Sequence, residues 1–436
     1  MSVTQSRKVS ISRATGDPAH ALVDWLEGAA EGDLLLVEFS LEQWWLARQP
    51  AVQSLIAIYS RQTAGDGFEC TVTGSADCPD EDRLASAGLG SWAEQNSLPV
   101  FRPGQPLQLS PVHIPKPWGQ EIWFTGAEER GLCGFSDGRN SLPIPWVQAL
   151  FPAEQAGVAG APLVLLKILD PAPQEVIGDL YFELHEEKRE VYVVTHVDRN
   201  AWPDGVGSIR YGFDPVKLAE AGSEAAFRQS YLNAVRAYEA VRRQIDALPQ
   251  GVAADTVIRR REEELRAQMN AFTHLRDLRV GDVVVVPLLM PHSLQHGVRT
   301  IEFQTPVYER QILSFAQKVL TQDHWDTEAA VSSMRLTPPE EDHFTVLLAE
   351  RGVTVERIVD FSDFEVRRVT LEPGADLVVE CARSYQLLMV VAGELPLGEA
   401  LLGPEEGALL PRGGQFSLAC APPGEPLVLL LAQPRR

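Results

Sequence analysis

Short apolar runs recur along the middle of the chain and predict β-strands. The runs are rich in β-branched and aromatic residues and are bounded by turn-forming residues, as strands usually are. They are PLVLLKIL (162–169), DLYFEL (179–184), EVYVVTHV (190–197), SIRYGF (208–213), LRVGDVVVVPLL (278–289) and TIEFQ (300–304). A last block over 345–436 repeats the pattern between Gly- and Pro-rich turns, which predicts a second antiparallel β unit.

Between these strands the apolar spacing changes to three or four residues, which predicts helices over 215–272. One stripe is formed by Phe227, Tyr231, Val235, Tyr238, Val241, Ile245 and Leu248. Pro249 and Gly251 are expected to end that helix, and a second helix is expected over 257–272. The fold class is therefore mainly β with a helical insert.

Residues 1–105 form an N-terminal extension of unknown role. The spacing of HALVDWLEGAA (20–30) predicts a helix, and LLLVEF (34–39) predicts a buried strand. The stretch from Thr63 to Pro106 is rich in Gly, Asp, Ser and Pro, which predicts a loop or linker. We find no chemical motif in this segment, and a packing extension or a partner surface is the simplest interpretation.

Length and charge limit the possible classes of protein. A chain of 436 residues is too long for one ordinary core, so two or three domains are expected. Its formal net charge of -22 argues against nucleic-acid and membrane partners. Five scattered cysteines without a CxxC pair, and no signal or membrane-spanning segment, predict a cytoplasmic protein with free thiols. Composition leaves the oligomeric state open.

Four residues have the spacing of a metal site. Glu183 and His185 are two apart on a predicted strand, so both side chains face the same side. Glu190 follows a short polar turn, and a hairpin there would return its carboxylate to the first two residues. His292 follows a strand and a proline-containing turn. Two carboxylates and two imidazoles suit zinc, iron, manganese or nickel, with positions left for water or substrate.

This spacing resembles the two signature motifs of the cupin β-barrels. Gly281, Pro287 and His292 match the second motif, in which a glycine, a proline and a late histidine are separated by fixed intervals. Leu289 replaces a glycine of that motif, and Glu183 replaces the first histidine of the other. The resemblance implies a barrel that holds one metal ion.

A narrower resemblance is to the type I mannose-6-phosphate isomerases. It is carried, in one order, by KPWG (116–119), PLVLLKILD (162–170), KRE (188–190), RYGF (210–213), VGDVVVVPLLMPH (280–292) and IEFQ (301–304). The resemblance implies a metal-binding cupin domain over 106–214 and 273–335 and a second, metal-free cupin domain over 340–436. It also implies a divalent metal, expected to be zinc, and a sugar or sugar phosphate as the small-molecule partner.

The resemblance places the family's zinc-ligand roles on Glu183, His185, Glu190 and His292. Arg310 is the candidate for the charge that stabilises an enediolate, and Lys188 the candidate for a substrate contact. Two simpler interpretations remain open: a surface ion pair between Arg310 and Glu309, and a solvated turn lysine at Lys188.

The chain also departs from the family. Glu183 stands where the family has glutamine, and DLYFE (179–183) replaces a serine-containing turn of its phosphate-binding segment. Glu309 separates Tyr308 from Arg310, which are adjacent in the family. The main hypothesis is a metal-dependent aldose–ketose isomerase that interconverts mannose 6-phosphate and fructose 6-phosphate or a related sugar. The alternatives are another metal-cupin enzyme, such as an oxygenase or an isomerase of unphosphorylated sugars, and a catalytically silent sugar- or metal-binding protein.

Overall fold

The computed structural model describes residues 9–46, 51–62, 67–249, 251–320, 322–337, 344–420 and 424–435. Contacts between residues divide the chain into two compact units. Unit 1 comprises Met1–Val112, Trp123–Leu165 and Thr345–Arg436, and unit 2 comprises His113–Ile122 and Leu166–Phe344. Each unit is therefore assembled from stretches that are distant in the sequence.

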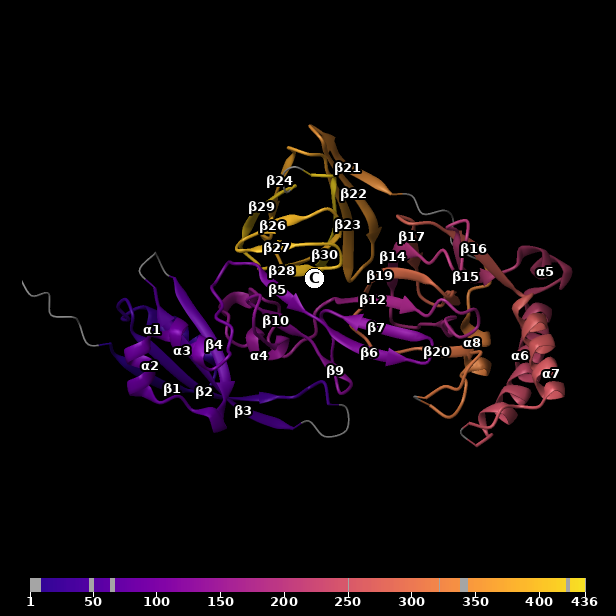
Figure 1. Cartoon of the computed structure of the whole chain (residues 1–436), viewed down its shortest axis with the longest axis horizontal. Helices are drawn as coiled ribbons and strands as arrows, with labels where there is room; N and C mark the ends of the chain where they lie inside the picture. The colour runs from indigo at the N-terminus through magenta and orange to yellow at the C-terminus, as the bar shows by residue number, and fades with distance from the viewer. Residues whose placement is uncertain are drawn as a thin grey trace, which may run out of the picture. The chain divides into compact units, whose positions relative to one another are not determined.

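The N-terminal part of unit 1 is a four-stranded sheet with helices packed on it (Figure 1). Its strands, in spatial order, are β1 (Ile11–Thr15), β2 (Leu34–Glu42), β3 (Val52–Arg61) and β4 (Phe68–Gly74). The helices of this part are α1 (Pro18–Leu26), α2 (Glu81–Ala87) and α3 (Leu89–Gln95), and a 3-10 turn, η1 (Ser75–Asp77), follows β4. Leu36, Ile58 and Trp92 belong to one buried apolar cluster, which joins the sheet to α3.

The composition of residues 63–106 predicts a loop, and this prediction is wrong for residues 68–95 but right for most of residues 96–106. Residues 63–66 lie outside the described residues, but β4, α2 and α3 follow. The aspartate and glycine that suggested a loop instead mark helix ends. Asp80 caps α2 by accepting a hydrogen bond from the Arg83 amide, and Gly88 separates α2 from α3 with a positive φ of 75°.

The C-terminal part of unit 1 is a large antiparallel β structure. Its nine-stranded sheet has the order β11 (Ser141–Pro143), β10 (Gly134–Ser136), β5 (Leu107–Ser110), β28 (Gly407–Leu410), β25 (Gln386–Ala392), β30 (Leu427–Pro434), β23 (Phe364–Leu371), β22 (Val353–Asp360) and β21 (Thr345–Glu350). Two strand pairs pack on it, namely β24 (Asp376–Glu380) with β29 (Gln415–Ala419) and β26 (Leu395–Leu397) with β27 (Ala400–Leu402). The connecting region contains β8 (Ala127–Glu128), β9 (Gly131–Leu132), α4 (Ile144–Gln148) and η2 (Pro152–Glu154).

Unit 2 is built from two sheets. The six-stranded sheet has the order β17 (Val283–Val286), β14 (Glu190–Val197), β19 (Val298–Gln304), β12 (Leu165–Pro171), β7 (Gly119–Trp123) and β6 (Val112–Lys116). The five-stranded sheet has the order β16 (Thr273–Leu278), β15 (Gly207–Phe213), β18 (His292–Leu294), β13 (Phe182–Leu184) and β20 (Gln311–Ser314). Tyr192 and Val194 of the first sheet share one buried cluster with Ile209 and Leu294 of the second, so the sheets pack face to face.

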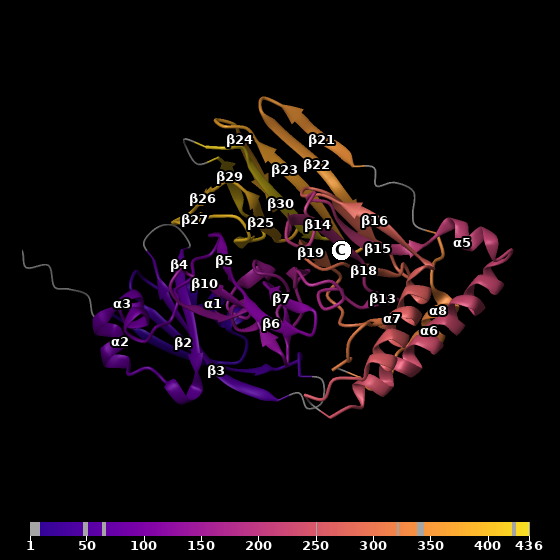
Figure 2. The ribbon, with the colours of Figure 1, turned by 45° about the vertical axis from the view of Figure 1, so that its right-hand side comes forward.

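The predicted helical insert is present in unit 2. It consists of α5 (Pro215–Glu220), α6 (Glu224–Asp246) and α7 (Thr256–Asn270), and α8 (Thr327–Ser333) follows later in the chain. Helices α6 and α7 lie side by side (Figure 2). The buried stripe of α6 includes Phe227 and Tyr231, which share a core cluster with Phe182 and Leu184 of β13. The helices therefore support the strand that carries Glu183.

The structure confirms a mainly β fold with a helical segment, but it divides the chain differently from the predicted domains. Residues 106–214 were expected in the metal-binding barrel. Instead β5 and β10 join the sheet of β28, where Leu107 pairs with Leu409 and Phe135 pairs with Leu109. Backbone pairing between such distant stretches leaves no trace in local apolar patterns. Among the described residues, no helix has the length and apolar character needed to cross a membrane.

Candidate metal centre

Three candidate ligands lie on neighbouring parts of the five-stranded sheet of unit 2. Glu183 is in β13, and its backbone is paired with that of His292 at the start of β18. His185 follows β13 and stays on the same side as Glu183 because side chains alternate along an extended segment. Strand pairing thus places the two histidines, which are far apart in the sequence, beside one another, with ring centroids 5.4 Å apart.

The fourth candidate comes from the opposite sheet. Glu190 begins β14, where its backbone pairs with Val286 and Gln304. Its carboxylate reaches across the interior to both imidazoles, with Glu190 Oε1 3.5 Å from His185 Nε2 and Glu190 Oε2 3.0 Å from His292 Nε2. The site therefore lies between the sheets, where water is excluded: the Glu190, His185 and His292 side chains are at most 3% exposed.

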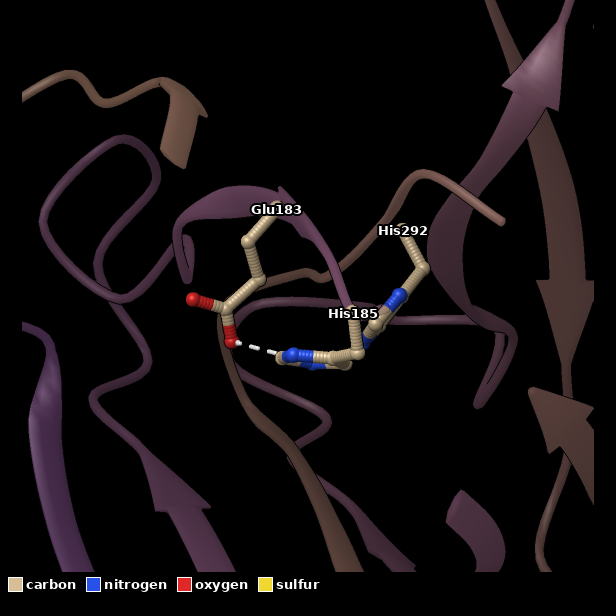
Figure 3. A group of neighbouring side chains, drawn as sticks. All are labelled: Glu183, His185 and His292. Atoms are coloured by element: carbon tan, nitrogen blue, oxygen red, sulfur yellow. Dashed lines mark ion pairs between the residues drawn. The ribbon is translucent and has the colours of Figure 1, made fainter. Parts of the chain in front are cut away.

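Ligand atoms of Glu183, His185 and His292 all lie within 4.8 Å of one another. Figure 3 shows the Glu183 carboxylate pointing at the His185 ring, with His292 beside it, and Glu183 Oε1 is 3.9 Å from His185 Nε2. Glu190 is not part of this three-residue group but contacts both of its histidines. The structure thus gathers all four predicted ligands in one place.

The backbone orients both imidazoles for coordination. His185 Nδ1 is 2.9 Å from the carbonyl oxygen of Glu309, and His292 Nδ1 is 3.0 Å from that of Met290. A carbonyl only accepts, so each Nδ1 carries the proton and each Nε2 is directed into the site. His185 Nε2 and Glu183 Oε2 are buried and make no hydrogen bond to any residue that the structure describes. Buried nitrogen and oxygen atoms that lack a hydrogen bond fit the binding of a cation.

The charges around the site keep one imidazole neutral. Burial lowers the pKa of His185 well below its ordinary value, and the Lys188 ammonium lowers it further. Burial also acts to lower the pKa of His292, but its hydrogen bond to Glu190 outweighs this and raises the pKa. Burial acts to raise the pKa of Glu190, yet Lys188 and the imidazoles hold that pKa well below its usual range. A metal ion would take the place of the proton on His292.

The two candidate catalytic cations both contact proposed ligands. Lys188 is 8% exposed and its Nζ lies 2.7 Å from Glu190 Oε1, so the solvated turn lysine is ruled out as an interpretation. Arg310 lies over the Tyr181 ring at 4.4 Å and is 3.8 Å from Glu183 Oε2. The Glu309 carboxylate instead accepts hydrogen bonds from the Glu186 and Glu187 amides, so the alternative of an Arg310–Glu309 ion pair is ruled out.

One ligand-bearing turn is strained. Leu289, which stands where the cupin motif has glycine, keeps a positive φ of 66°, and its amide donates to the His185 carbonyl at 2.7 Å. A leucine in this region costs conformational energy that glycine would not. The hydrogen bond that this conformation allows helps to hold the backbone of His185.

Further buried polar and charged residues lie near the candidate metal centre, and the sequence analysis did not identify them as part of a site. Lys167 Nζ lies 2.8 Å from Gln304 Oε1 and 3.9 Å from Glu302 Oε2, and Tyr192 donates a hydrogen bond to Glu190 at 2.7 Å. Burial is the main cause that raises the pKa of Glu302 to about 8. Their position inside predicted strands could have drawn attention to Lys167 and Glu302. Burying a charged side chain among apolar residues is costly unless the charge is paired.

No protein-family model matches the chain, and no curated protein matches it. Solved structures do match. Mannose 6-phosphate isomerase from Bacillus subtilis is 14% identical, with 76% of this chain and 99% of that chain covered and a TM-score of 0.53. A zinc-bound mannose 6-phosphate isomerase is 12% identical, with 76% and 100% covered and a TM-score of 0.55. A mutant phosphomannose isomerase from Salmonella typhimurium is 13% identical, with 75% and 99% covered and a TM-score of 0.53.

At these identities the likeness shows the fold alone. The resemblance to type I mannose-6-phosphate isomerases that the sequence motifs suggested is thereby confirmed at the level of the fold. It extends over about three quarters of the chain and over nearly the whole length of each matched structure. The activity has to be argued from the site itself.

Proposed function

We propose that this protein is a metal-dependent aldose–ketose isomerase acting on mannose 6-phosphate and fructose 6-phosphate or on a related sugar. Glu183, His185, Glu190 and His292 would hold a divalent metal, with zinc as the expected ion. The observation that carries the proposal is the convergence of two oriented imidazoles and two carboxylates in a buried space. A donor set of nitrogen and oxygen atoms suits zinc and similar transition metals.

The chemistry moves a proton between adjacent carbons of the sugar. A bound metal would polarise the carbonyl and hydroxyl oxygens of the substrate. Arg310 is held over Tyr181 beside Glu183, which is a suitable place from which its guanidinium would stabilise negative charge on an enediolate oxygen. Lys188 is fixed by Glu190 and would donate a hydrogen bond to a substrate oxygen at the rim of the site.

A second candidate is an isomerase of an unphosphorylated sugar. It is favoured by the local charge pattern, because Lys188 and Arg310 each lie beside a proposed ligand carboxylate. The segment that replaces the family's serine-containing turn contributes Asp179, whose carboxylate pairs with His296 at 2.8 Å. Carboxylates at these positions would oppose a phosphate group.

One experiment tests the proposal and separates the candidates. Purified full-length protein is analysed for bound metals, and isomerisation is then followed with mannose 6-phosphate and with mannose. Bound zinc with turnover of the phosphorylated sugar supports the main proposal, while turnover of mannose alone supports the second. Bound iron without isomerisation would point to oxygen chemistry. Bound metal without turnover of any sugar would leave a binding protein, and no bound metal would refute both isomerases.

A further inference from the structure

A pocket lies in the C-terminal β structure of unit 1, and none of the residues that line it is a proposed metal ligand. Its volume is about 1240 Å³, and its lining comes from the ends of β22, β23, β24, β25 and β30 and from the turns beside them. The pocket is lined by four arginines, which are Arg367, Arg383, Arg412 and Arg435. Such a gathering is unexpected in a chain with 38 basic and 60 acidic residues.

Three of these arginines have carboxylate partners. Arg367 and Arg435 both contact Glu365, and Arg435 also contacts Asp360 at 2.6 Å. Arg412 is 3.2 Å from Glu154. Two carboxylates, those of Asp360 and Glu380, line the pocket itself. Together with Glu154 and Glu365, these carboxylates balance the charge of the four arginines, so the local charge is about neutral in a protein whose net charge is -22.

The fourth arginine is not neutralised. Arg383 is exposed and makes no ion pair or side-chain hydrogen bond to any residue in the described part of the chain. Next to it in the sequence, Ser384 is 8% exposed and its hydroxyl has no partner among the described residues. The Nε of Arg367 is buried and also lacks a hydrogen-bond acceptor in the described structure. The pocket therefore holds one arginine without a carboxylate partner, and further donors without acceptors lie beside it.

We propose that this pocket binds a small organic anion through its phosphate or carboxylate group, with Arg383 as the main charged contact. A guanidinium matches both groups geometrically and donates two parallel hydrogen bonds to either. The neighbouring Ser384 hydroxyl and the Arg367 Nε would supply further donors. The volume far exceeds that of an inorganic ion and is large enough for an organic ligand. The site needs no metal and does not depend on the proposed isomerase activity.

The test is calorimetric titration of the full-length wild-type protein and of Arg383→Gln with inorganic phosphate, fructose 6-phosphate, citrate and fructose. The matched control is Arg351→Gln, because Arg351 is also an exposed arginine of this β structure without an ion pair among the described residues, and it is outside the pocket. Both variants remove one positive charge from the protein surface. Only the first removes it from the pocket.

We expect the wild-type protein to bind phosphate-bearing probes or citrate but not fructose. Arg383→Gln should weaken that binding on the order of 10- to 100-fold, as expected for loss of a charge-assisted contact. Arg351→Gln should leave it unchanged. Binding of fructose 6-phosphate without citrate identifies phosphate as the recognised group, and the reverse identifies carboxylate.

Failure of this proposal is distinguishable from failure of the proposed isomerase. Inorganic phosphate or citrate binding that survives Arg383→Gln would overturn the pocket assignment, because fructose 6-phosphate is the probe that the candidate metal centre is also expected to bind. Absence of binding by every anionic probe, or an equal loss in Arg383→Gln and Arg351→Gln, would overturn it as well. Binding that depends on Arg383 requires neither bound metal nor turnover.

Discussion

The two β structures of this protein differ in the polar groups that they bury. The C-terminal β structure has an apolar core cluster that includes Leu388, Leu410 and Leu429, all fully buried, and its buried Glu365 is paired with arginines. The interior of unit 2 also has an apolar cluster, but Glu190 and His292 are buried in the same space. Burying charged groups costs free energy that a well-packed apolar core would not. The difference is consistent with the proposed metal site in unit 2, whose buried imidazoles and carboxylates reduce stability.

The comparison also shows how little a β architecture says about function. Both regions are antiparallel sheets with apolar residues facing inward. They differ in a few inward-facing positions where unit 2 carries imidazoles and carboxylates instead of aliphatic side chains. The following predictions test whether these positions separate a chemical interior from a structural one.

The largest expected effect is loss of the metal. Replacing both imidazoles in His185→Ala/His292→Ala removes two of four ligands, and elemental analysis should find no stoichiometric transition metal. The control is His20→Ala/His324→Ala, because those side chains are 90% and 64% exposed. An unchanged metal content in the site variant would refute the assignment.

The next effect concerns the rate. If the protein is an isomerase, Arg310→Ala should lower kcat on the order of 100- to 1,000-fold, because one stabilising charge near the enediolate is lost. Metal content should stay at the wild-type level. Arg260→Ala removes an arginine side chain that is 81% exposed and serves as the control. An unaltered rate would make Arg310 a structural partner of Glu183 and Tyr181.

A substitution in the apolar core of the C-terminal β structure should lower the stability of the protein without changing its metal content. Leu388→Ala leaves a cavity in the C-terminal core and should lower the free energy of unfolding by about 2 to 5 kcal/mol. Metal content should be unaffected. The same truncation at Leu401, which is 55% exposed, should change stability by less than about 0.5 kcal/mol. Denaturant unfolding measures both, and a loss of metal in Leu388→Ala would contradict the separation of roles.

Metal affinity should fall in acid. Binding requires neutral His292, and its contact with Glu190 raises the pKa of the imidazole, so a proton competes with the metal as the pH decreases through that pKa. Each pH unit below it should weaken binding by up to about tenfold. Competition with a chelator between about pH 8 and about pH 5 measures the change. A constant affinity over this range would exclude imidazole ligands.

The smallest effect is expected at the residue that departs from the family. Glu183→Gln keeps an oxygen ligand but removes a negative charge, so metal affinity should fall on the order of tenfold without being abolished. Glu187→Gln removes a charge from an exposed side chain nearby and should have no effect. Chelator competition compares the two variants. Equal affinities for Glu183→Gln and the wild type would show that Glu183 lies outside the coordination sphere.

Much of the secondary structure could be predicted from the local pattern of apolar and polar residues. The strands that carry Glu183 and Glu190, the helical insert and the candidate ligands were predicted from spacing and residue type, whereas the short strand that begins at His292 was not. Helix and strand periodicity are properties of neighbouring residues, so a single chain displays them. The likeness in fold to mannose 6-phosphate isomerases was predicted from short motifs of the same kind.

The tertiary structure alone decided which distant residues meet. Nothing near Leu107 indicates that β5 would pair with β28, some 300 residues later (Leu107 with Leu409), or that Arg310 would turn from Glu309 toward Glu183. Leu289 shows the same limit, since its left-handed backbone is imposed by surroundings that outweigh leucine's own preference. The sequence by itself determined the local elements and the chemical types of the ligands. Long-range pairing and packing decided their partners, because those energies depend on residues that only folding brings together.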